Sequence, residues 1–561
     1  MAINSRNRSA SYTLSAARYL DVVRGVWAGK FIGGTLGAPV EGWKRRHAFP
    51  DQHLPSGIAE NDDTDLQILW LHALEEHGVR LNSTHLVSEW REHVRAPWSE
   101  YGIAAANWEC GVSPPQSGWF NNWYWCNGMG CPIRSEIWGV ICPGAPALAA
   151  NFAAQDGQID HASDAVEAEK FYAAIEASLF SAVSIESLLD IGLAQIDSRS
   201  RLTALVADVR EWARASEWPV VREQILARYG HPDATHVLQN VGFTVLGLLA
   251  GQGDFGRTMA ITLNCGYDAD CTAASAGAIL GGMLGHSGIP EEYRVAVPPA
   301  YKVSEWMRGF PRDGSIEALC VASCHLGLDV AKEWGTGFVL EGSLPPRPPP
   351  LPVTAFTVPP PRPPTRRFPT WVVHGPYWRA WDERATADLA AGEHGTPGLP
   401  SMLYFTHNQA GFELDPLSGA RLSLEEGSPE KTGVGRWVVP ATDDRLNLDQ
   451  VVPDIGPACY YAVAEFRAPT AMRVWLMLGA TGPVEVWLNG DRVIHSETYQ
   501  PLTPTTFSFA ASLPAGVNRL VLKLARTSQP LRACVSFKRH TGTHWHQSFY
   551  ATELEWLPMP N

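Results

Sequence analysis

Residues 266–285 read GYDADCTAASAGAILGGMLG and decide the fold of the first part of the chain. Two carboxylates, Asp268 and Asp270, stand at the start of a helical pattern. The run that follows, Thr272–Gly285, is rich in Ala, Gly and Ser. Small residues let the backbones of neighbouring helices approach closely. The stretch therefore predicts a buried, tightly packed helix that begins on an acidic group.

A second acidic block, Glu60–Asp65 (ENDDTD), precedes another helical pattern. In Asp65–His77 the apolar residues follow one helical stripe, and Gly78 is expected as the C-cap. One Asp or Thr is enough to cap a helix, whereas several carboxylates on one buried helix end are costly unless a cation compensates them. Hard oxygen ligands suit Mg²⁺, Mn²⁺ or Ca²⁺ rather than zinc. Spacing alone leaves helix capping and metal binding as open alternatives.

The wider periodicity predicts two domains. Helical patterns such as Ala165–Ala182 and Val237–Ala250 indicate an all-α domain over residues 15–340. Residues 341–369 are proline-rich and predict an extended, stiff linker, with an SH3-type ligand as the alternative reading. Residues 370–561 change to strand-length patterns and predict an antiparallel, jelly-roll-like β-sandwich.

Several short segments carry the sandwich prediction. Asn489-Gly490, between VEVWL and DRVIH, is a strong signal for a two-residue hairpin. The other expected strands are Met472–Leu478, Phe507–Phe509, Arg519–Leu524 and Cys534–Lys538. This region is similar to the galactose-binding-like modules appended to glycoside hydrolases. Carbohydrate binding and a structural or oligomerisation role remain open alternatives for it.

Composition excludes several classes of protein. The 561 residues are 45% hydrophobic and 18% charged, which excludes wholesale disorder. The net charge of −14 argues against nucleic acid or an anionic membrane as partner. No apolar run reaches the roughly 18 residues of a membrane span, and the N-terminal residues do not read as a signal peptide. Ten cysteines are too sparse for a disulfide scaffold, so we expect reduced thiols and a cytoplasmic location.

Three separated blocks resemble the ADP-ribosylglycohydrolase superfamily, in the order found in that family. They are Gly29–Glu41 (GKFIGGTLGAPVE), Asn61–Thr64 (NDDT) and Gly266–Ala274 (GYDADCTAA). Between them, Asn127–Gly139 resembles the family's glycine-rich loop with its arginine, and Asp160-His161 matches a Thr-His-type position. The resemblance covers about residues 20–340 and implies an all-α bundle with a central cleft that holds a pair of Mg²⁺ ions.

The resemblance assigns a metal site and also shows departures from the family pattern. The implied metal-site positions are Asn61, Asp62, Asp63, Asp268, Asp270, Cys271 and Thr272. Asn61 and Cys271 stand where the family usually has Thr, and Gly34 stands where it usually has Asp. A cysteine is a poor ligand for Mg²⁺, so either Thr272 or Asp65 is expected to supply an oxygen in its place. One or two Mg²⁺ ions are expected, with Mn²⁺ or Ca²⁺ as alternatives.

The implied chemistry is hydrolysis at C1 of a ribosyl or related sugar. Such a reaction passes through an oxocarbenium-like state, and it needs a positioned water and a base. The candidates for the base are Glu41, Asp62 and Asp63. The candidate substrate-binding residues are Gly128, Gly130, Arg134, His161 and Asn240. For these five the alternative is structural: a tight loop, a buried salt bridge, and hydrogen bonds inside the core.

The sequence therefore predicts a divalent-metal-dependent glycohydrolase. Its N- or O-glycosidic substrate is ADP-ribosyl or a carbohydrate glycoside such as a pentofuranoside, and no nucleic acid or membrane partner is expected. A non-catalytic nucleotide- or sugar-binding protein on the same fold is the alternative. The oligomeric state stays open.

Overall fold

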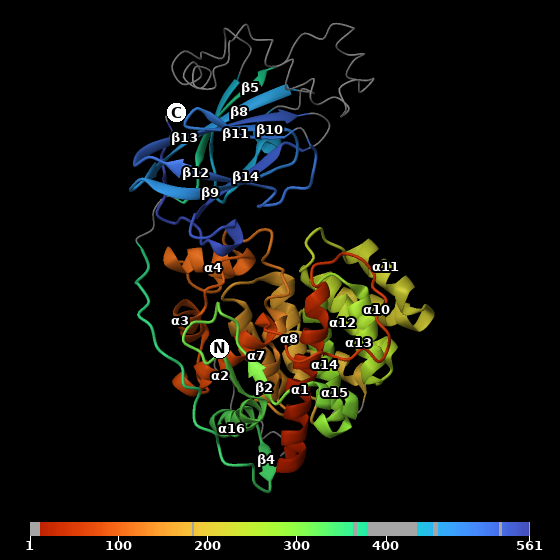
Figure 1. Ribbon diagram of the computed structural model, residues 1–561. Coiled ribbons are helices and arrows are strands. Elements are labelled where there is room, and N and C mark those ends of the chain that lie inside the picture. Colours follow the sequence, from red (N-terminus) through yellow and green to blue (C-terminus); the bar gives the residue numbers. More distant parts are fainter. Residues whose placement is uncertain are drawn as a thin grey trace. The chain divides into compact units, whose positions relative to one another are not determined.

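The computed structural model describes residues 12–181, 184–362, 367–377, 435–452, 458–496, 498–526 and 530–559. The chain forms two compact units (Figure 1). The helical unit comprises residues 1–96 and 112–359, and the β unit comprises residues 97–111 and 360–561.

Helices dominate the helical unit, as the sequence predicted. They are α1 (Ala16–Gly37), α2 (Asp62–His77), α3 (Ser83–His93), α5 (Gln116–Trp119), α6 (Glu136–Val140), α7 (Pro146–Gly157), α8 (Ser163–Glu176), α9 (Ile185–Leu193), α10 (Arg201–Ala215), α11 (Trp218–Tyr229), α12 (Val237–Gly251), α13 (Phe255–Cys265), α14 (Ala269–Leu284), α15 (Glu291–Ala296) and α16 (Ile316–Trp334). Single 3₁₀ turns are η1 (Ala38–Val40), η2 (Pro132–Arg134) and η3 (His286–Gly288).

Two small sheets in this unit did not follow from the sequence. β1 (Tyr12–Ser15) pairs in parallel with β4 (Phe338–Glu341), and β2 (Ala300–Lys302) pairs antiparallel with β3 (Asp313–Ser315). Each strand has only three or four residues, which is too short for a periodic signal.

Several predicted helix boundaries are close to those observed. α2 ends at the expected cap Gly78, α12 covers the range predicted for it, and α14 ends at Leu284, one residue before the predicted end at Gly285. The helix predicted over Ala165–Ala182 is shorter, because α8 ends at Glu176 and turns occupy residues 177–181, whereas Ala182 lies outside the described residues.

The close approach of α1 and α14 organises the helical unit. Gly25, Gly29, Gly33 and Gly37 recur every four residues and therefore lie on one side of α1. A Cβ atom placed on Gly29 would lie 1.9 Å from the carbonyl oxygen of Gly277 on α14. One placed on Gly37 would lie 2.2 Å from the Cα of Asp270. The two helices are antiparallel, so the end of α1 meets the acidic start of α14.

The proline-rich stretch is extended, as proline chemistry requires, and it lies along the helical unit up to Pro359. The Leu351 N–H donates to Oε2 of Glu75 (3.1 Å), and the Thr354 N–H donates to the Gly309 carbonyl (3.0 Å). The guanidinium of Arg308 stacks 3.6 Å from the ring centroid of Phe356. These contacts fix this part of the stretch to helices and loops of the helical unit.

The β unit is an antiparallel sandwich, which confirms the predicted fold. Its strands are β5 (Thr370–Tyr377), β6 (Gly435–Pro440), β7 (Arg445–Asn447), β8 (Ala458–Ala468), β9 (Met472–Ala480), β10 (Val484–Leu488), β11 (Asp491–Ser496), β12 (Phe507–Leu513), β13 (Gly516–Arg526), β14 (Arg532–Arg539) and β15 (Glu555–Trp556). Within the described residues one sheet has the order β11-β10-β13-β8-β5-β6 with β15 on β8, and the other has the order β12-β9-β14-β7. Large side chains such as Trp371, Tyr460 and Phe466 fill the core between them.

Two local features of the β unit bear on the predictions. Asn489 (φ 54°) and Gly490 (φ 96°) form the hairpin turn between β10 and β11 with the positive φ angles that this dipeptide predicts. Helix α4 (Ser99–Glu109) also belongs to this unit by its contacts, although it lies early in the chain. Nη2 of Arg539 on β14, for example, lies 3.2 Å from Oε2 of Glu109.

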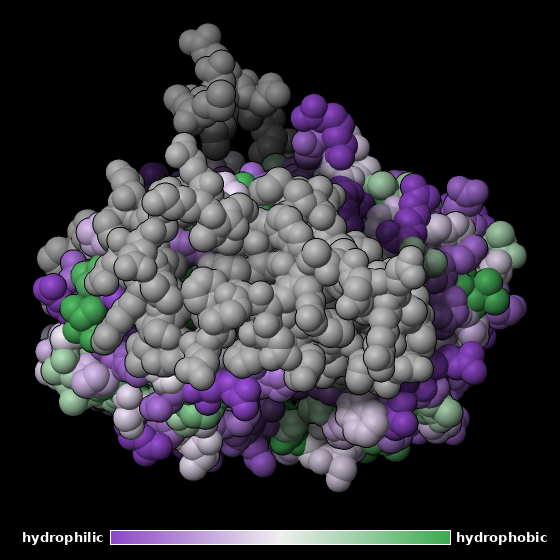
Figure 2. Space-filling model, turned by 90° about the horizontal axis from the view of Figure 1, so that it is seen from above, coloured by the Kyte–Doolittle hydropathy of each residue, from purple (hydrophilic) through white to green (hydrophobic). Residues whose placement is uncertain are grey.

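Three general properties of the described residues concern the surface, membrane-spanning helices and the cysteines. Hydrophilic and hydrophobic residues are interspersed on the described part of the face in Figure 2. In the described residues no helix combines the length and apolarity needed to cross a membrane. All cysteines whose side chains the structure describes are free thiols, and Cys320 and Cys324 lie in the core.

Candidate functional site

The two acidic blocks meet where α1 ends and where α2 and α14 begin. Asn61 caps α2, because its Oδ1 accepts a hydrogen bond from the Asp63 N–H (2.7 Å). The Asn61 Nδ2 donates to Oδ2 of Asp270 (3.1 Å), and Sγ of Cys271 donates to Oδ1 of Asp63 (3.2 Å). Helix starts that are far apart in the sequence are thus in direct contact.

Carboxylate oxygens at this junction are close enough to share a cation. Ligand atoms of Glu41, Asp268 and Asp270 all lie within 4.8 Å of one another, and the same holds for Asp63, Asp270 and Cys271. Oδ1 of Asp268 and Oδ1 of Asp270 are buried, and neither has a hydrogen-bond partner in the described part of the chain. Buried oxygens without donors are unfavourable, so this donor set fits a hard divalent cation.

The electrostatics of the cluster lead to the same conclusion. Burial and the neighbouring carboxylates raise the pKa of Asp62, Asp268 and Asp270 well above the usual value. Desolvation and the charges of Asp62 and Asp63 also raise the pKa of Glu41 to about 7, although the residue as a whole is exposed. These carboxyls repel one another when they are ionised, and a bound cation would relieve that repulsion.

Lys30 is a buried cation at the cluster that sequence reasoning missed. Its Nζ lies 3.3 Å from Oδ2 of Asp63 and 2.8 Å from Oε1 of Glu136, and it donates to the Ile133 carbonyl (2.7 Å). Burial lowers the pKa of Lys30, but these two carboxylates outweigh burial and raise the pKa above its usual value. The available signal was that Lys30 is the only charged residue in the glycine-rich segment Gly25–Gly37.

Two residues considered as alternative oxygen donors are engaged elsewhere. Asp65 accepts a hydrogen bond from the Ser304 N–H (3.2 Å), and burial raises its pKa to about 7. The Thr272 hydroxyl donates to the Ala269 carbonyl of its own helix (3.2 Å). Asp62 lies half-buried in the first turn of α2.

The glycine loop and its arginine make contacts inside the protein. Arg134 is fully buried, with Nε 2.8 Å from Oδ1 of Asp156 and Nη2 2.7 Å from Oδ1 of Asp160. The Gly128 N–H donates to the Trp125 carbonyl (2.9 Å), and the Gly130 carbonyl accepts from Nη1 of Arg134 (3.0 Å). They are the contacts expected if these residues have a structural role, namely a buried salt bridge and a tight loop.

Asn240 and His161 differ in their relation to the acidic cluster. Asn240 borders it, because its Oδ1 accepts a hydrogen bond from the Asp268 N–H (3.3 Å) and its Nδ2 donates to the Ala234 carbonyl (2.8 Å). His161 is buried with Nδ1 2.7 Å from Oδ1 of Asp160. It lines a cavity of about 400 Å³ that also touches Trp119.

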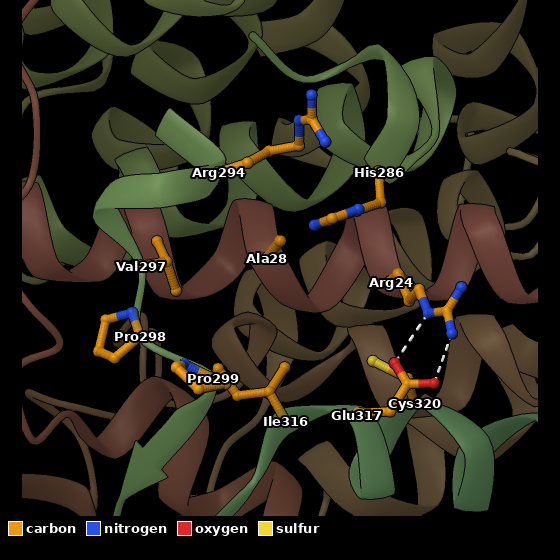
Figure 3. Close-up of a pocket in the computed structure, with 10 residues that line it drawn as sticks. All are labelled: Arg24, Ala28, His286, Arg294, Val297, Pro298, Pro299, Ile316, Glu317 and Cys320. Carbon is orange, nitrogen blue, oxygen red and sulfur yellow. Dashed lines mark hydrogen bonds and ion pairs between the residues drawn. The ribbon is translucent and has the colours of Figure 1, made fainter. Parts of the chain in front are cut away.

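A further cavity of about 400 Å³ lies beside α1, α15 and α16 (Figure 3). Its lining includes Arg24, Arg294 and Glu317, and Nε of Arg24 donates to Oε2 of Glu317 (2.8 Å). No residue predicted for the site lines this cavity.

Comparisons with known proteins address the helical unit. A sequence model described as ADP-ribosylglycohydrolase matches residues 15–322. Among solved structures 31 chains match, and one of them belongs to an "ADP-ribosylglycohydrolase-related protein complex". That chain is 18% identical with a TM-score of 0.41, over 55% of this chain and 99% of its own length. No curated protein matches the chain.

Proposed function

The chain belongs to the ADP-ribosylglycohydrolase family, and from this premise we propose that it is a divalent-metal-dependent glycohydrolase. The proposed reaction is hydrolysis of the N- or O-glycosidic bond at C1 of a ribosyl or pentofuranosyl substrate. The observation that carries the proposal is the junction of α2 and α14, where the buried oxygens of Asp268 and Asp270 have no hydrogen-bond partner among the described residues.

Asp268, Asp270 and Glu41 are the residues that would hold the cation, because their oxygens lie within 4.8 Å of one another. Mg²⁺, Mn²⁺ or Ca²⁺ suits these oxygens, and a bound ion of this kind lowers the pKa of water and orients sugar hydroxyls. The thiol of Cys271 donates to Asp63 and is a poor partner for such an ion.

Other residues of the site would position the ligands, accept a proton and balance charge. Asn240 holds the backbone of Asp268 in place, and Asn61 holds the carboxylate of Asp270. Glu41 is exposed, so a carboxylate oxygen that does not contact the cation can face an attacking water and take a proton from it. Lys30 compensates the charge of Asp63 from inside the core.

Two substrate classes and one non-catalytic alternative need to be separated. The family's name points to ADP-ribosyl compounds, whereas the β-sandwich favours a carbohydrate glycoside, such as a pentofuranoside. A protein that binds a nucleotide or sugar without turnover is the alternative. In that case the same cluster would bind a cation, but no bond at C1 would be cleaved.

The test is a metal-controlled substrate panel on the full chain. ADP-ribosylated peptide, ADP-ribose and pentofuranosides are incubated with Mg²⁺, Mn²⁺, Ca²⁺ or a chelator, and released sugar is measured by mass spectrometry. We expect cleavage that the chelator abolishes and that Asp270→Asn lowers at least about 100-fold. Asp190→Asn is the matched control, since Asp190 is exposed and pairs with Arg210. Cation binding without cleavage of any substrate would support the binding alternative instead.

A further inference from the structure

A second cluster of metal-type ligands joins α2 to α3. Glu89 and His93 lie four residues apart on α3, and His72 faces them from α2. Nε2 of His72 lies 3.4 Å from Oε2 of Glu89, and Nε2 of His93 lies 3.5 Å from the same oxygen. One ligand atom of each residue falls within 4.8 Å of the other two. None of these residues belongs to the acidic junction.

The hydrogen bond of His93 fixes which of its ring nitrogens faces Glu89. Nδ1 lies 2.9 Å from the Arg308 carbonyl, which can only accept, so Nδ1 carries the hydrogen. In the neutral ring, Nε2 then presents a lone pair to the carboxylate. Oε2 of Glu89 is buried and has no hydrogen-bond partner in the described part of the chain. Buried lone pairs that face one another in this way are unfavourable unless a positive charge lies between them.

We propose that His72, Glu89 and His93 bind a first-row transition-metal dication of the Zn²⁺ type, with water as a fourth ligand. Metal–ligand bonds of about 2.0–2.2 Å in a tetrahedron place neighbouring ligand atoms roughly 3.3–3.6 Å apart. The two separations that involve Glu89 match this value. Imidazole together with carboxylate selects Zn²⁺-type ions over Mg²⁺, so the cation differs from that proposed for the acidic junction.

The surroundings resemble the supporting shell of a metal site. Nε2 of His77 lies 2.7 Å from Oε1 of Glu89 and so holds the second carboxylate oxygen, as the Arg308 carbonyl holds His93. The ring of Phe310 packs edge-on against His72 and His93 at 5.6 and 5.4 Å. Glu89 and His93 are buried, whereas 13% of the His72 side chain is exposed, which leaves a path for the ion.

The site would act as a structural clamp. It ties α2 to α3 and, through Arg308, to the loop that packs under Phe356 of the proline-rich stretch. α2 carries the acidic block in its first turn, so the clamp would hold the helix that positions the proposed catalytic residues. The metal-binding proposal does not depend on the reaction that the acidic junction performs.

The test measures zinc binding by the full chain, stripped of metal and kept reduced, against a chromophoric chelator. We expect one tight equivalent of Zn²⁺ in the wild type. His72→Gln and His93→Gln should each weaken it at least about 100-fold, since even the loss of a residue that only hydrogen-bonds to a metal ligand costs about 10–100-fold. His325→Gln is the matched control, because His325 is half-buried on α16, outside the cluster, and its Nε2 hydrogen-bonds to the Pro345 carbonyl (2.9 Å). Asp270→Asn should leave zinc affinity unchanged, which separates this site from the acidic junction.

A spectrum of the wild type keeps the proposal falsifiable if a variant fails to fold. Co²⁺ bound in tetrahedral geometry absorbs strongly in the visible range, so we expect such bands in the Co²⁺-loaded wild type and their loss on adding Zn²⁺. Absence of both the bands and zinc uptake would mean that these histidines only hydrogen-bond to Glu89, and it would overturn the proposal. Zinc binding that persists unchanged in folded His72→Gln and His93→Gln would place the metal on other residues and would also overturn it.

Discussion

Two substitutions one residue apart on α1 test whether the approach of α1 to α14 builds the site. In Gly33→Ala the new methyl carbon would lie 2.1 Å from the Ala273 carbonyl oxygen and 2.5 Å from the Ala274 nitrogen. These are backbone atoms that cannot rotate away, so the helices must separate. In Gly34→Ala the nearest atom is Nδ2 of Asn61 at 3.0 Å, a side-chain atom that needs to shift by only a few tenths of an ångström within its hydrogen bonds.

The structure gives the expected difference in stability between these variants. Both gain about 1 kcal/mol of helix propensity when Gly becomes Ala. Only Gly33→Ala must push two backbones apart by more than about 1 Å, and overpacking of this kind costs about 3 kcal/mol or more. We therefore expect Gly33→Ala to be less stable than Gly34→Ala by about 2–4 kcal/mol, which lowers the unfolding midpoint of this large helical unit by roughly 3–6 °C.

The assay is thermal unfolding, followed by the helical circular-dichroism signal, in the presence of a chelator so that metal binding does not contribute. Wild type, Gly33→Ala and Gly34→Ala are measured side by side. If Gly33→Ala unfolds at the same temperature as Gly34→Ala, or above the wild type, α1 and α14 do not pack at this distance and the reasoning fails.

Three further predictions concern other parts of the chain. Lys30→Met leaves Asp63 and Glu136 buried without their cation and should cost about 3–5 kcal/mol in urea unfolding, and a loss under 1 kcal/mol would contradict the pairing. Gly490→Ala strains a residue with φ 96° and should lower the stability of the β unit by about 1 kcal/mol, measured by urea unfolding followed by the β-sheet circular-dichroism signal. Burial lowers the pKa of Lys538 to about 7, so between pH 7 and about 10 the unfolded chain binds more protons and the free energy of unfolding rises with pH. Urea titrations at several pH values should show this rise to be larger in the wild type than in Lys538→Met, and equal slopes would refute it.

Structural features that depend only on residues close together in the chain could be predicted from the sequence. The acidic first turn of α2, its Gly78 cap and the small-residue helix α14 each follow from residues close together in the chain. The Asn489-Gly490 turn follows in the same way. The contact between the two acidic blocks needed a family resemblance, because spacing alone gives no distance between separate helices.

Features that depend on packing between distant elements were missed. Lys30 meets Glu136 only because α1 passes the η2–α6 turn, and a lone lysine in a helix carries no sign of its partner. His72 lies beside Glu89 and His93 because α2 packs on α3. In the sequence, a histidine in each of two separate helices gives no sign that they form one cluster. Arg134 could be assigned to ligand or to core from sequence, and only its contacts with Asp156 and Asp160 separate the two readings.

The central claim is that the starts of α2 and α14 bind a hard divalent cation together. Anomalous X-ray diffraction from crystals grown with Mn²⁺ tests it most directly, because the ion's position is read without reference to any substrate. We predict an anomalous peak within bonding distance of carboxylate oxygens of Asp268 and Asp270. Full density for both side chains with no peak between them, or a peak held by other residues alone, would contradict the account.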